Sequence, residues 1–236
     1  MGTSRLTFLI ASFLLAGASL RAQAGPGALP RALKLGDYLR DDYVRGLIAS
    51  RSPFRSSVYD SPQSAKVIRR DGESVLIAVF NFHEGGPDFV ILPNGSLAVE
   101  SDAGSDLSNL TFTILDSTRF RMGFDKFEPQ TFIYVGNLDR YVAKFTVVGD
   151  YVDGRNRRYA FRADGTAVFP DREFKYSVGT DHVLNHFDYF EDETAHVTYG
   201  FKWHNGVLDL FRTHGAIGQD VDNTPFSTLR QCCGKR

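Results

Sequence analysis

Two stretches of the chain, ESVLIAVFNFHEGGPDFVILPNGSLAV (residues 73–99) and AKFTVVGDYVDGRNRRYAFRADGTAVF (residues 143–169), align without a gap. Few letters are identical, but the apolar pattern and the turn chemistry persist. Each stretch reads as strand, turn, strand, Asx-Gly turn and strand, and Asn94-Gly95-Ser96 falls on Asp164-Gly165-Thr166. Self-similarity at a fixed offset is typical of a chain that contains two copies of one supersecondary unit. The alignment therefore predicts an internal duplication.

The rest of the chain after about residue 65 also shows the period of two that is typical of strands. Turn residues recur about every 8 to 12 positions between these runs, as in all-β sandwiches and barrels. The strand signals continue almost to the end and leave no room for crossover helices, which argues against a parallel sheet. We therefore predict an all-β fold, an antiparallel up-and-down β-barrel of about 8–12 strands. Its two pseudo-repeats, at about residues 65–138 and 139–214, would close on one another; two stacked sheets are the alternative.

The dipeptide Asn205-Gly206 gives the sharpest local prediction, because it is a strong signal for a two-residue hairpin turn. Such a turn fixes the strand register on both sides. One face then carries large apolar residues, and the other carries polar pairs such as Lys202 with Asp209, which is a favourable arrangement. The predicted pairs are His204 with Val207, Trp203 with Leu208, Lys202 with Asp209, Phe201 with Leu210, Tyr199 with Arg212 and Thr198 with Thr213.

The N-terminus has the features of a secretory signal peptide. Arg5 precedes an apolar run from Leu6 to Ala18, and Ala22-Gln23-Ala24 is a small-x-small cleavage site. The run is shorter than the about 20 residues that a transmembrane helix needs. We therefore expect a secreted or periplasmic protein without a transmembrane segment in the mature chain.

A single helix is predicted before the strands. Leu39, Tyr43 and Leu47 recur at helical spacing, and Asp37 is a suitable N-cap. This helix would either pack against one end of the barrel or act as a lid over a cavity. The predicted domain plan is a signal peptide (1–24), a linker (25–36), the helix (37–52), the β-barrel domain (53–230) and a C-terminal tail (215–236).

Composition limits the partners and the cross-links. The formal net charge is −1, and no Lys/Arg stripe is longer than the one from Arg155 to Arg158, so a nucleic-acid partner is not expected. The only two cysteines, Cys232 and Cys233, are adjacent. Their Cα atoms are about 3.8 Å apart, which would strain a bridge between them. The core is therefore not held by disulfides.

The predicted architecture resembles the lipocalin and fatty-acid-binding (calycin-type) superfold, in which a meander of strands forms a barrel. The resemblance rests on the export signal, one short helix and the aromatic-rich strands over about residues 65–214. The nearest match to the lipocalin Gly-x-Trp signature is Gly149-Asp150-Tyr151. The resemblance implies a small apolar ligand inside the barrel.

The most specific candidate site lies on the strand after the hairpin. By the predicted register, Arg212 and His214 share the inward face with Leu208 and Leu210, next to Tyr199. A guanidinium there suits a carboxylate, because it offers a bidentate fork. The arrangement is similar to the inward Arg-x-Tyr of fatty-acid-binding proteins, with Arg212 matching the Arg and His214 in place of the Tyr; the alternative is that Arg212 extends into solvent at the rim. The predicted ligand-binding residues are Phe161, Tyr176, Tyr199, Phe201, Trp203, Arg212 and His214.

No metal site, cofactor or catalytic centre is predicted. Five of the six histidines lie between His182 and His214, but in an extended strand His182 and His186 are about 13 Å apart and cannot share one ion. His83 and Glu84 could serve as an acid/base pair, but their glycine-rich surroundings indicate a polar turn. No nucleophile elbow or phosphate loop accompanies them.

The leading hypothesis is thus a secreted or periplasmic β-barrel that binds a small, largely apolar ligand, with or without a carboxylate. A barrel with a solid core would instead favour a structural or protein-interaction domain of the cell envelope, with an envelope protein as partner. A hydrolase-like enzyme is the third and least favoured class.

Overall fold

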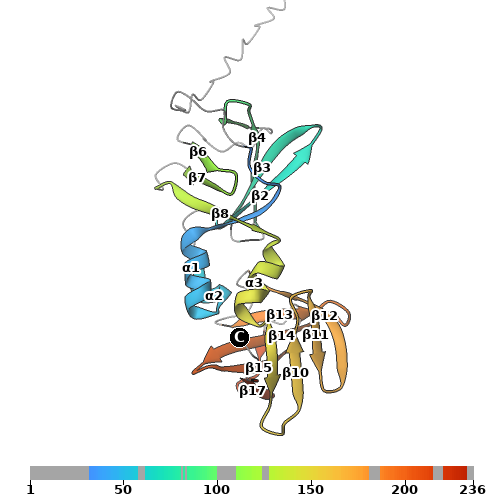
Figure 1. Cartoon of the computed structure of the whole chain (residues 1–236). Coiled ribbons are helices and arrows are strands. Elements are labelled where there is room, and N and C mark those ends of the chain that lie inside the picture. Colours follow the sequence, from blue (N-terminus) through green and yellow to red (C-terminus); the bar gives the residue numbers. More distant parts are fainter. Residues whose placement is uncertain are drawn as a thin grey trace, which may run out of the picture.

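The computed structural model describes residues 32–57, 62–80, 82, 84–99, 110–123, 128–180, 187–214 and 220–232. Within these ranges the strands form two antiparallel sheets, one from each half of the chain (Figure 1). The predicted signal peptide and residues 25–31 of the predicted linker lie outside the described residues.

In the described residues the first sheet has eight strands, and the first and the last of them in chain order lie side by side in the middle of the sheet. β1 (Gly36–Arg40) pairs with β2 (Ser64–Arg70) on one side and with β8 (Gln130–Gly136) on the other. No pairing joins the two outermost strands in the described part of the chain. The strands that follow β2 outward are β3 (Glu73–Phe80), β4 (Glu84–Ile91) and β5 (Leu97–Val99), and those that precede β8 are β7 (Arg119–Gly123) and β6 (Thr111–Asp116).

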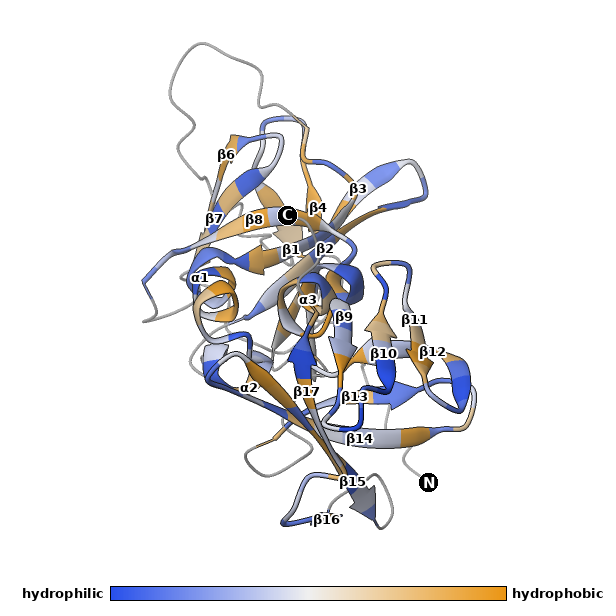
Figure 2. Ribbon diagram, turned by 60° about the horizontal axis from the view of Figure 1, so that its bottom comes forward, coloured by the Kyte–Doolittle hydropathy of each residue, from blue (hydrophilic) through white to orange (hydrophobic). Residues whose placement is uncertain are grey.

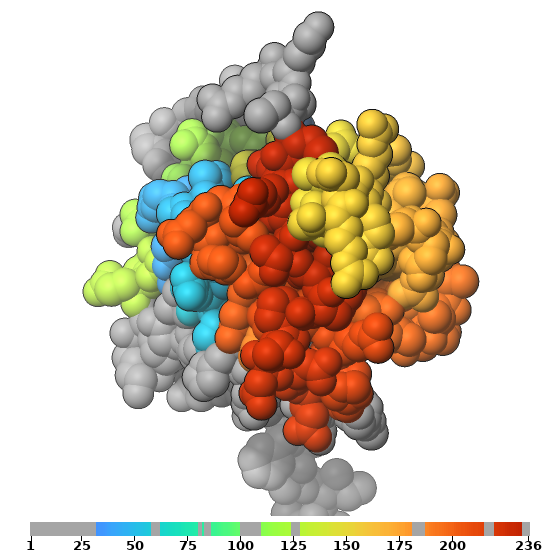
Figure 3. Space-filling view, turned by 90° about the horizontal axis from the view of Figure 1, so that it is seen from below, coloured from blue at the N-terminus to red at the C-terminus, as the bar shows by residue number. Residues whose placement is uncertain are grey.

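The second sheet closes on itself. β15 (Val207–His214) pairs with β14 (Val197–His204) and with β17 (Ser227–Gln231), and β17 pairs with β9 (Gly149–Val152). Figure 3 shows this closure from below, with the red C-terminal residues beside the yellow segment of β9. The remaining strands are β10 (Arg158–Phe161), β11 (Thr166–Phe169), β12 (Arg172–Val178) and β13 (Asp188–Asp192) in order around the barrel, and β16 (Asp220–Val221), which pairs with the end of β15.

Between the two sheets lie the three helices of the described ranges, α1 (Asp41–Ser50), α2 (Pro53–Ser56) and α3 (Leu138–Thr146) (Figures 1 and 2). Tyr43 and Leu47 of α1 and Val142 of α3 belong to the same buried cluster as the aromatic residues of the second barrel. Complete burial of such apolar side chains stabilises a fold by roughly 1.5–3 kcal/mol each. The helices therefore close one end of the second barrel as packing elements.

The structure corrects the predicted start of the first helix. Residues 36–40 form β1, and α1 begins only at Asp41. Leu39 lies in β1 and Tyr43 in α1, so their spacing of four residues crosses a strand-to-helix junction. Both residues are apolar because both are fully buried in the same core. Asp37 does serve a helix terminus, but that of α3, where its Oδ2 accepts the N–H of Leu138 at 2.9 Å.

The predicted fold class is confirmed, since the chain is antiparallel, up-and-down and barrel-like, with a helix early in the sequence. One detail differs: the two halves do not close on one another, and each forms a barrel-like sheet of its own. The reason is the pairing of chain-distant strands within each half. β1 meets β8, and β9 meets β17, so each half pairs its own chain-distant strands. The second sheet thereby satisfies its edges, and among the described residues the first sheet leaves β5 and β6 as unpaired edges.

The predicted internal similarity is confirmed at its Asx-Gly turns, but its first strand is wrong in the second copy, where residues 143–146 are the end of α3. In one copy the N–H of Leu92 donates to Ser96 O at 2.9 Å, and in the other the N–H of Arg162 donates to Thr166 O at 2.8 Å. Gly95 and Gly165 occupy the same left-handed conformation, with φ of 79° and 80°. The two turns nevertheless join β4 to β5 and β10 to β11, which are different places in the two sheets.

A second repeat, Gly-Asp-Tyr, marks the correspondence of the two halves at their first strands. Gly36-Asp37-Tyr38 stands at the first strand of the first sheet, and Gly149-Asp150-Tyr151 stands at the first strand of the second. Each tyrosine hydroxyl donates to the carbonyl four residues earlier, Tyr38 to Lys34 at 2.9 Å and Tyr151 to Val147 at 2.6 Å. The nearest match to the Gly-x-Trp signature therefore does lie at the start of a barrel.

The predicted hairpin register is confirmed for every pair from His204–Val207 to Tyr199–Arg212. Thr198 and Thr213 also meet, since Thr213 Oγ1 donates to Thr198 O at 2.7 Å. The prediction of a C-terminal tail from residue 215 is wrong for residues 227–231. These residues form β17, the strand that closes the second barrel. Burial of Leu229 explains why this short segment is held in the barrel.

Candidate functional site

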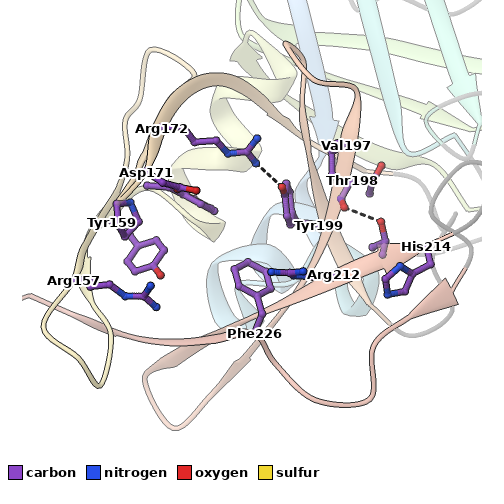
Figure 4. Close-up of a pocket in the computed structure, with 13 residues that line it drawn as sticks. Arg157, Tyr159, Asp171, Arg172, Val197, Thr198, Tyr199, Arg212, His214 and Phe226 are labelled. Carbon is purple, nitrogen blue, oxygen red and sulfur yellow. Dashed lines mark hydrogen bonds between the residues drawn. The ribbon is translucent and has the colours of Figure 1, made fainter.

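A cavity of about 610 Å³ lies at the end of the second barrel that is remote from the helices (Figure 4). The first residues of β14 line it, whereas Trp203 near the other end of β14 contacts the helical segment through Thr146. The cavity combines an aromatic wall with charged groups. The aromatic residues are Tyr159, Phe169, Tyr199 and Phe226, and the charged or titratable residues are Arg157, Asp171, Arg172, Arg212 and His214.

The three arginines of the cavity differ in their partners. Arg157 Nε lies 2.7 Å from Asp153 Oδ2, and Arg172 Nη1 lies 3.0 Å from Asp192 Oδ2. Arg212 is exposed, and its guanidinium lies 5.7 Å from the centre of the Phe226 ring. Among the described residues no carboxylate pairs with Arg212. This guanidinium is therefore the free cationic group of the cavity within the described ranges.

Tyr199 lies beside Arg212 because the two residues are direct partners across β14 and β15. Directly opposite residues of an antiparallel pair have Cβ atoms about 4.5–5.5 Å apart. The Tyr199 ring stacks on Phe190 at 5.3 Å between centres and lies 5.8 Å from Phe226. Its hydroxyl accepts a hydrogen bond from Arg172 Nη2, as Figure 4 shows.

Arg172 is held in place from two sides. Its guanidinium lies 4.7 Å from the Phe174 ring centre and pairs with Asp192, which is only 1% exposed. The Asp192 carboxylate also accepts the backbone N–H groups of Thr194 at 2.9 Å and Ala195 at 3.0 Å. The acidic run from Glu191 to Glu193 thus contains a buried structural carboxylate.

The barrel interior beneath the cavity is filled by aromatic rings. Phe161, Tyr176 and Phe201 are 1%, 4% and 0% exposed. Phe161 packs edge-on against Tyr176 at 5.3 Å and against Phe190 at 5.1 Å. Side chains packed in this way close the floor of the cavity, so the predicted ligand-binding residues Phe161, Tyr176 and Phe201 lie in the core and outside the cavity.

Of the other predicted site residues, Trp203 lies at the opposite end of the barrel. Its Nε1 donates to Thr146 O at 3.0 Å, and the Arg51 guanidinium lies 3.6 Å from its ring centre. The structure therefore brings together three of the seven predicted residues, Tyr199, Arg212 and His214. His214 is exposed, and its Nε2 lies 2.7 Å from Asp222 Oδ1.

The remaining histidines do not form a cluster within the described residues. His204 Nε2 lies 2.6 Å from Asp209 Oδ2, and His196 Nδ1 lies 3.5 Å from Glu191 Oε1. His83, His182 and His186 lie outside the described residues. Across the described ranges no group of three or more His, Cys, Asp or Glu side chains is placed to hold a metal ion.

Sequence reasoning missed Arg157 and Arg172 as cavity residues. A usable signal was present for Arg172, because it has the same parity as Phe174 and Tyr176 along β12 and therefore shares their inward face. Arg157 precedes β10 in a turn, and its place beside the cavity follows only from the closure of the barrel.

Taken together, the fold and the site define a protein with two calycin-like, antiparallel barrel sheets and a cationic, aromatic-walled cavity in the second. No family model and no curated protein matches the sequence, so the likeness to calycins is one of architecture. None of the helices in the described ranges is long and apolar enough to span a membrane.

Proposed function

We propose that this protein is exported, to the periplasm or the exterior, and binds a small, partly apolar anion in the cavity of the second barrel. The observation that carries the proposal is the free guanidinium of Arg212 beside the aromatic wall of Tyr199 and Phe226. Small-molecule sites are typically clefts of about 300–1,000 Å³ with apolar walls and a few polar groups. The cavity of about 610 Å³ is within this range.

The filled interior restricts the ligand to the mouth of the barrel. A ligand that extended along the barrel axis would have to displace Phe161 and Phe190, which are packed at 5.1 Å between ring centres. Loss of such core packing costs several kcal/mol. The proposed ligand is therefore short, and the long chain of a fatty acid does not fit the barrel axis.

Calorimetric titration of small acids and their neutral amides against three proteins tests the proposal. Wild type is compared with Arg212→Ala and with Arg230→Ala, which removes an exposed arginine of β17 away from the cavity. A hydrogen bond to a charged group contributes about 1.5–3 kcal/mol, so Arg212→Ala should weaken binding of acids by about 10- to 100-fold. Equal affinity of wild type and Arg212→Ala for every acid that binds would contradict the proposal.

The solid core of the second barrel supports a second candidate, a structural or protein-interaction domain of the cell envelope. The packed rings of Phe161, Tyr176 and Phe201 would then serve stability alone. Native mass spectrometry of protein purified from its own host distinguishes the two candidates. A retained small molecule supports ligand binding, and a stoichiometric protein partner without added small mass supports the second candidate.

A further inference from the structure

We infer that Arg172 is a positioning residue that directs the Tyr199 hydroxyl proton into the cavity, and that Tyr199 and Arg212 together bind a planar aromatic monocarboxylate. This inference rests on the proposed function, because it names the ligand class of the same cavity. It goes beyond the proposal in assigning the donor that reads the acid group and the residues that orient this donor.

The direction of the Tyr199 proton follows from its hydrogen bond with Arg172. A guanidinium has only donors, so in this contact the Tyr199 oxygen must be the acceptor. The phenol also has one O–H donor, and this donor needs an acceptor other than Arg172. No described residue accepts from Tyr199, and its half-buried ring lines the cavity. The proton is thus available to a bound ligand.

Arg172 cannot readily turn away from this role. Asp192 pairs with it at 3.0 Å, and the backbone N–H groups of Thr194 and Ala195 fix that carboxylate. The Phe174 ring supports the guanidinium from the side at 4.7 Å. Because every one of these contacts is local to β12 and the turn after β13, the Tyr199 donor is oriented before a ligand arrives, which reduces the entropic cost of binding.

Tyr199 and Arg212 then converge on one anion. They are directly opposite in the β14–β15 register and both line the cavity, as the side chains in Figure 4 show. A carboxylate has two oxygens that accept hydrogen bonds, and one guanidinium and one hydroxyl match them. The other two arginines already have carboxylate partners, so the cavity offers charge for a single negative group.

The wall of the cavity favours a flat ring next to that carboxylate. Tyr199 and Phe226 lie 5.8 Å apart, and Tyr159 and Phe169 lie 5.1 Å apart in an edge-on arrangement. These wall rings pack on one another, and the faces and edges that they present to the cavity can make the same tilted or edge-on contacts with a ligand ring. The closed floor limits the ligand to one or two rings.

The test uses calorimetric titration of 2-naphthoate, 2-naphthamide and octanoate. We expect wild type to bind 2-naphthoate at least about 10-fold more tightly than the amide or octanoate, because each lacks one of the two recognised features. Tyr199→Phe keeps the ring and removes only the donor, so it should weaken naphthoate binding by about 5- to 10-fold and leave naphthamide binding unchanged.

Arg172→Lys keeps a positive charge beside Asp192 but loses the planar fork, and it should reduce the preference for acid over amide. In the double variant with Tyr199→Phe, the Arg172→Lys change should have no further effect on that preference, which separates positioning from a general structural role. Failure of Arg172→Lys to fold would leave Tyr199→Phe as the decisive variant.

The outcomes are separable. If none of the three compounds binds wild type, the proposed function fails for this ligand class and the inference fails with it. If 2-naphthoate binds but Tyr199→Phe binds it equally well, or if octanoate or naphthamide binds as tightly, the inference is overturned and the proposed anion site stands.

Discussion

The substitution Asp188→Asn should stabilise the protein at neutral pH, which is the opposite of what most buried substitutions do. Asp188 begins β13 and is 7% exposed. Its Oδ1 accepts the N–H of Phe54 in α2 at 2.7 Å, so it joins the helical segment to the second barrel. No carboxylate–cation pair of Asp188 is found within 4.0 Å among the described residues.

Burial raises the pKa of Asp188 from 3.8 to about 6, although several neighbours lower it. These neighbours are the Phe54 N–H, the Ser52 hydroxyl and the charges of Arg55 and Lys202. Tyr43 of α1 also faces this carboxylate, whose charge raises the pKa of the buried Tyr43 hydroxyl further above its burial-raised level. The carboxylate is thus ionised at neutral pH in surroundings that disfavour its charge.

The magnitude follows from linkage. A difference of about two pKa units between the folded and unfolded states corresponds to about 3 kcal/mol. The group is an acid whose pKa is raised on folding, so its penalty is absent below the unfolded pKa of 3.8 and complete above the folded pKa of about 6. The free-energy penalty from the Asp188 carboxylate therefore shrinks, and the protein gains stability from this group, as the pH falls from 7.5 towards 4.

Urea denaturation of wild type and Asp188→Asn at pH 7.5, 5 and 4 measures the effect. The amide keeps an acceptor for Phe54 N–H and removes the charge, so the variant should be more stable by up to about 3 kcal/mol at pH 7.5. The difference should fall to about half at pH 5 and to about a fifth at pH 4. Asp220→Asn, at an exposed site, serves as the control. A variant that is less stable than wild type at pH 7.5, with an unchanged pH dependence, would refute the reasoning.

Three further predictions concern other parts of the chain. Arg51→Ala removes the guanidinium 3.6 Å above the Trp203 ring and should lower the free energy of unfolding by about 1–2 kcal/mol; an unchanged tryptophan emission spectrum would argue against this contact. Gly165→Ala should lower the melting temperature because φ is 80° there, whereas Gly154→Ala, which meets nothing within 4 Å, should have little effect; equal melting temperatures would contradict the turn assignment. N-terminal sequencing of protein exported by its own host should begin at Gly25, and retention of residue 1 would contradict the predicted signal peptide.

Local interactions explain what could be predicted about the fold. The β14–β15 register depends on Asn205-Gly206 and on alternating side chains within eight residues of it, and the structure agrees pair by pair. The equivalent turns at Gly95 and Gly165 were visible for the same reason, since a left-handed glycine after Asn or Asp is encoded in a few adjacent residues.

The candidate site was predictable only in part. Strand parity placed Tyr199, Arg212 and His214 on one side of the hairpin, and the cavity contains all three. The same parity could not distinguish a cavity wall from a filled core, because Phe161 and Phe201 also face inward. Whether an inward ring meets space or another ring depends on every strand around the barrel.

The sequence by itself determined the strand period, the turns and the pairing of strands that are neighbours in the chain, because these depend on backbone preferences over a few residues. Only the tertiary structure decided that β1 closes on β8 and that β17 closes on β9, which makes two barrel sheets in place of one. Such pairings join residues about a hundred or eighty positions apart, and no local preference specifies them. They form because each half can bury its own apolar face and satisfy most of its own strand edges.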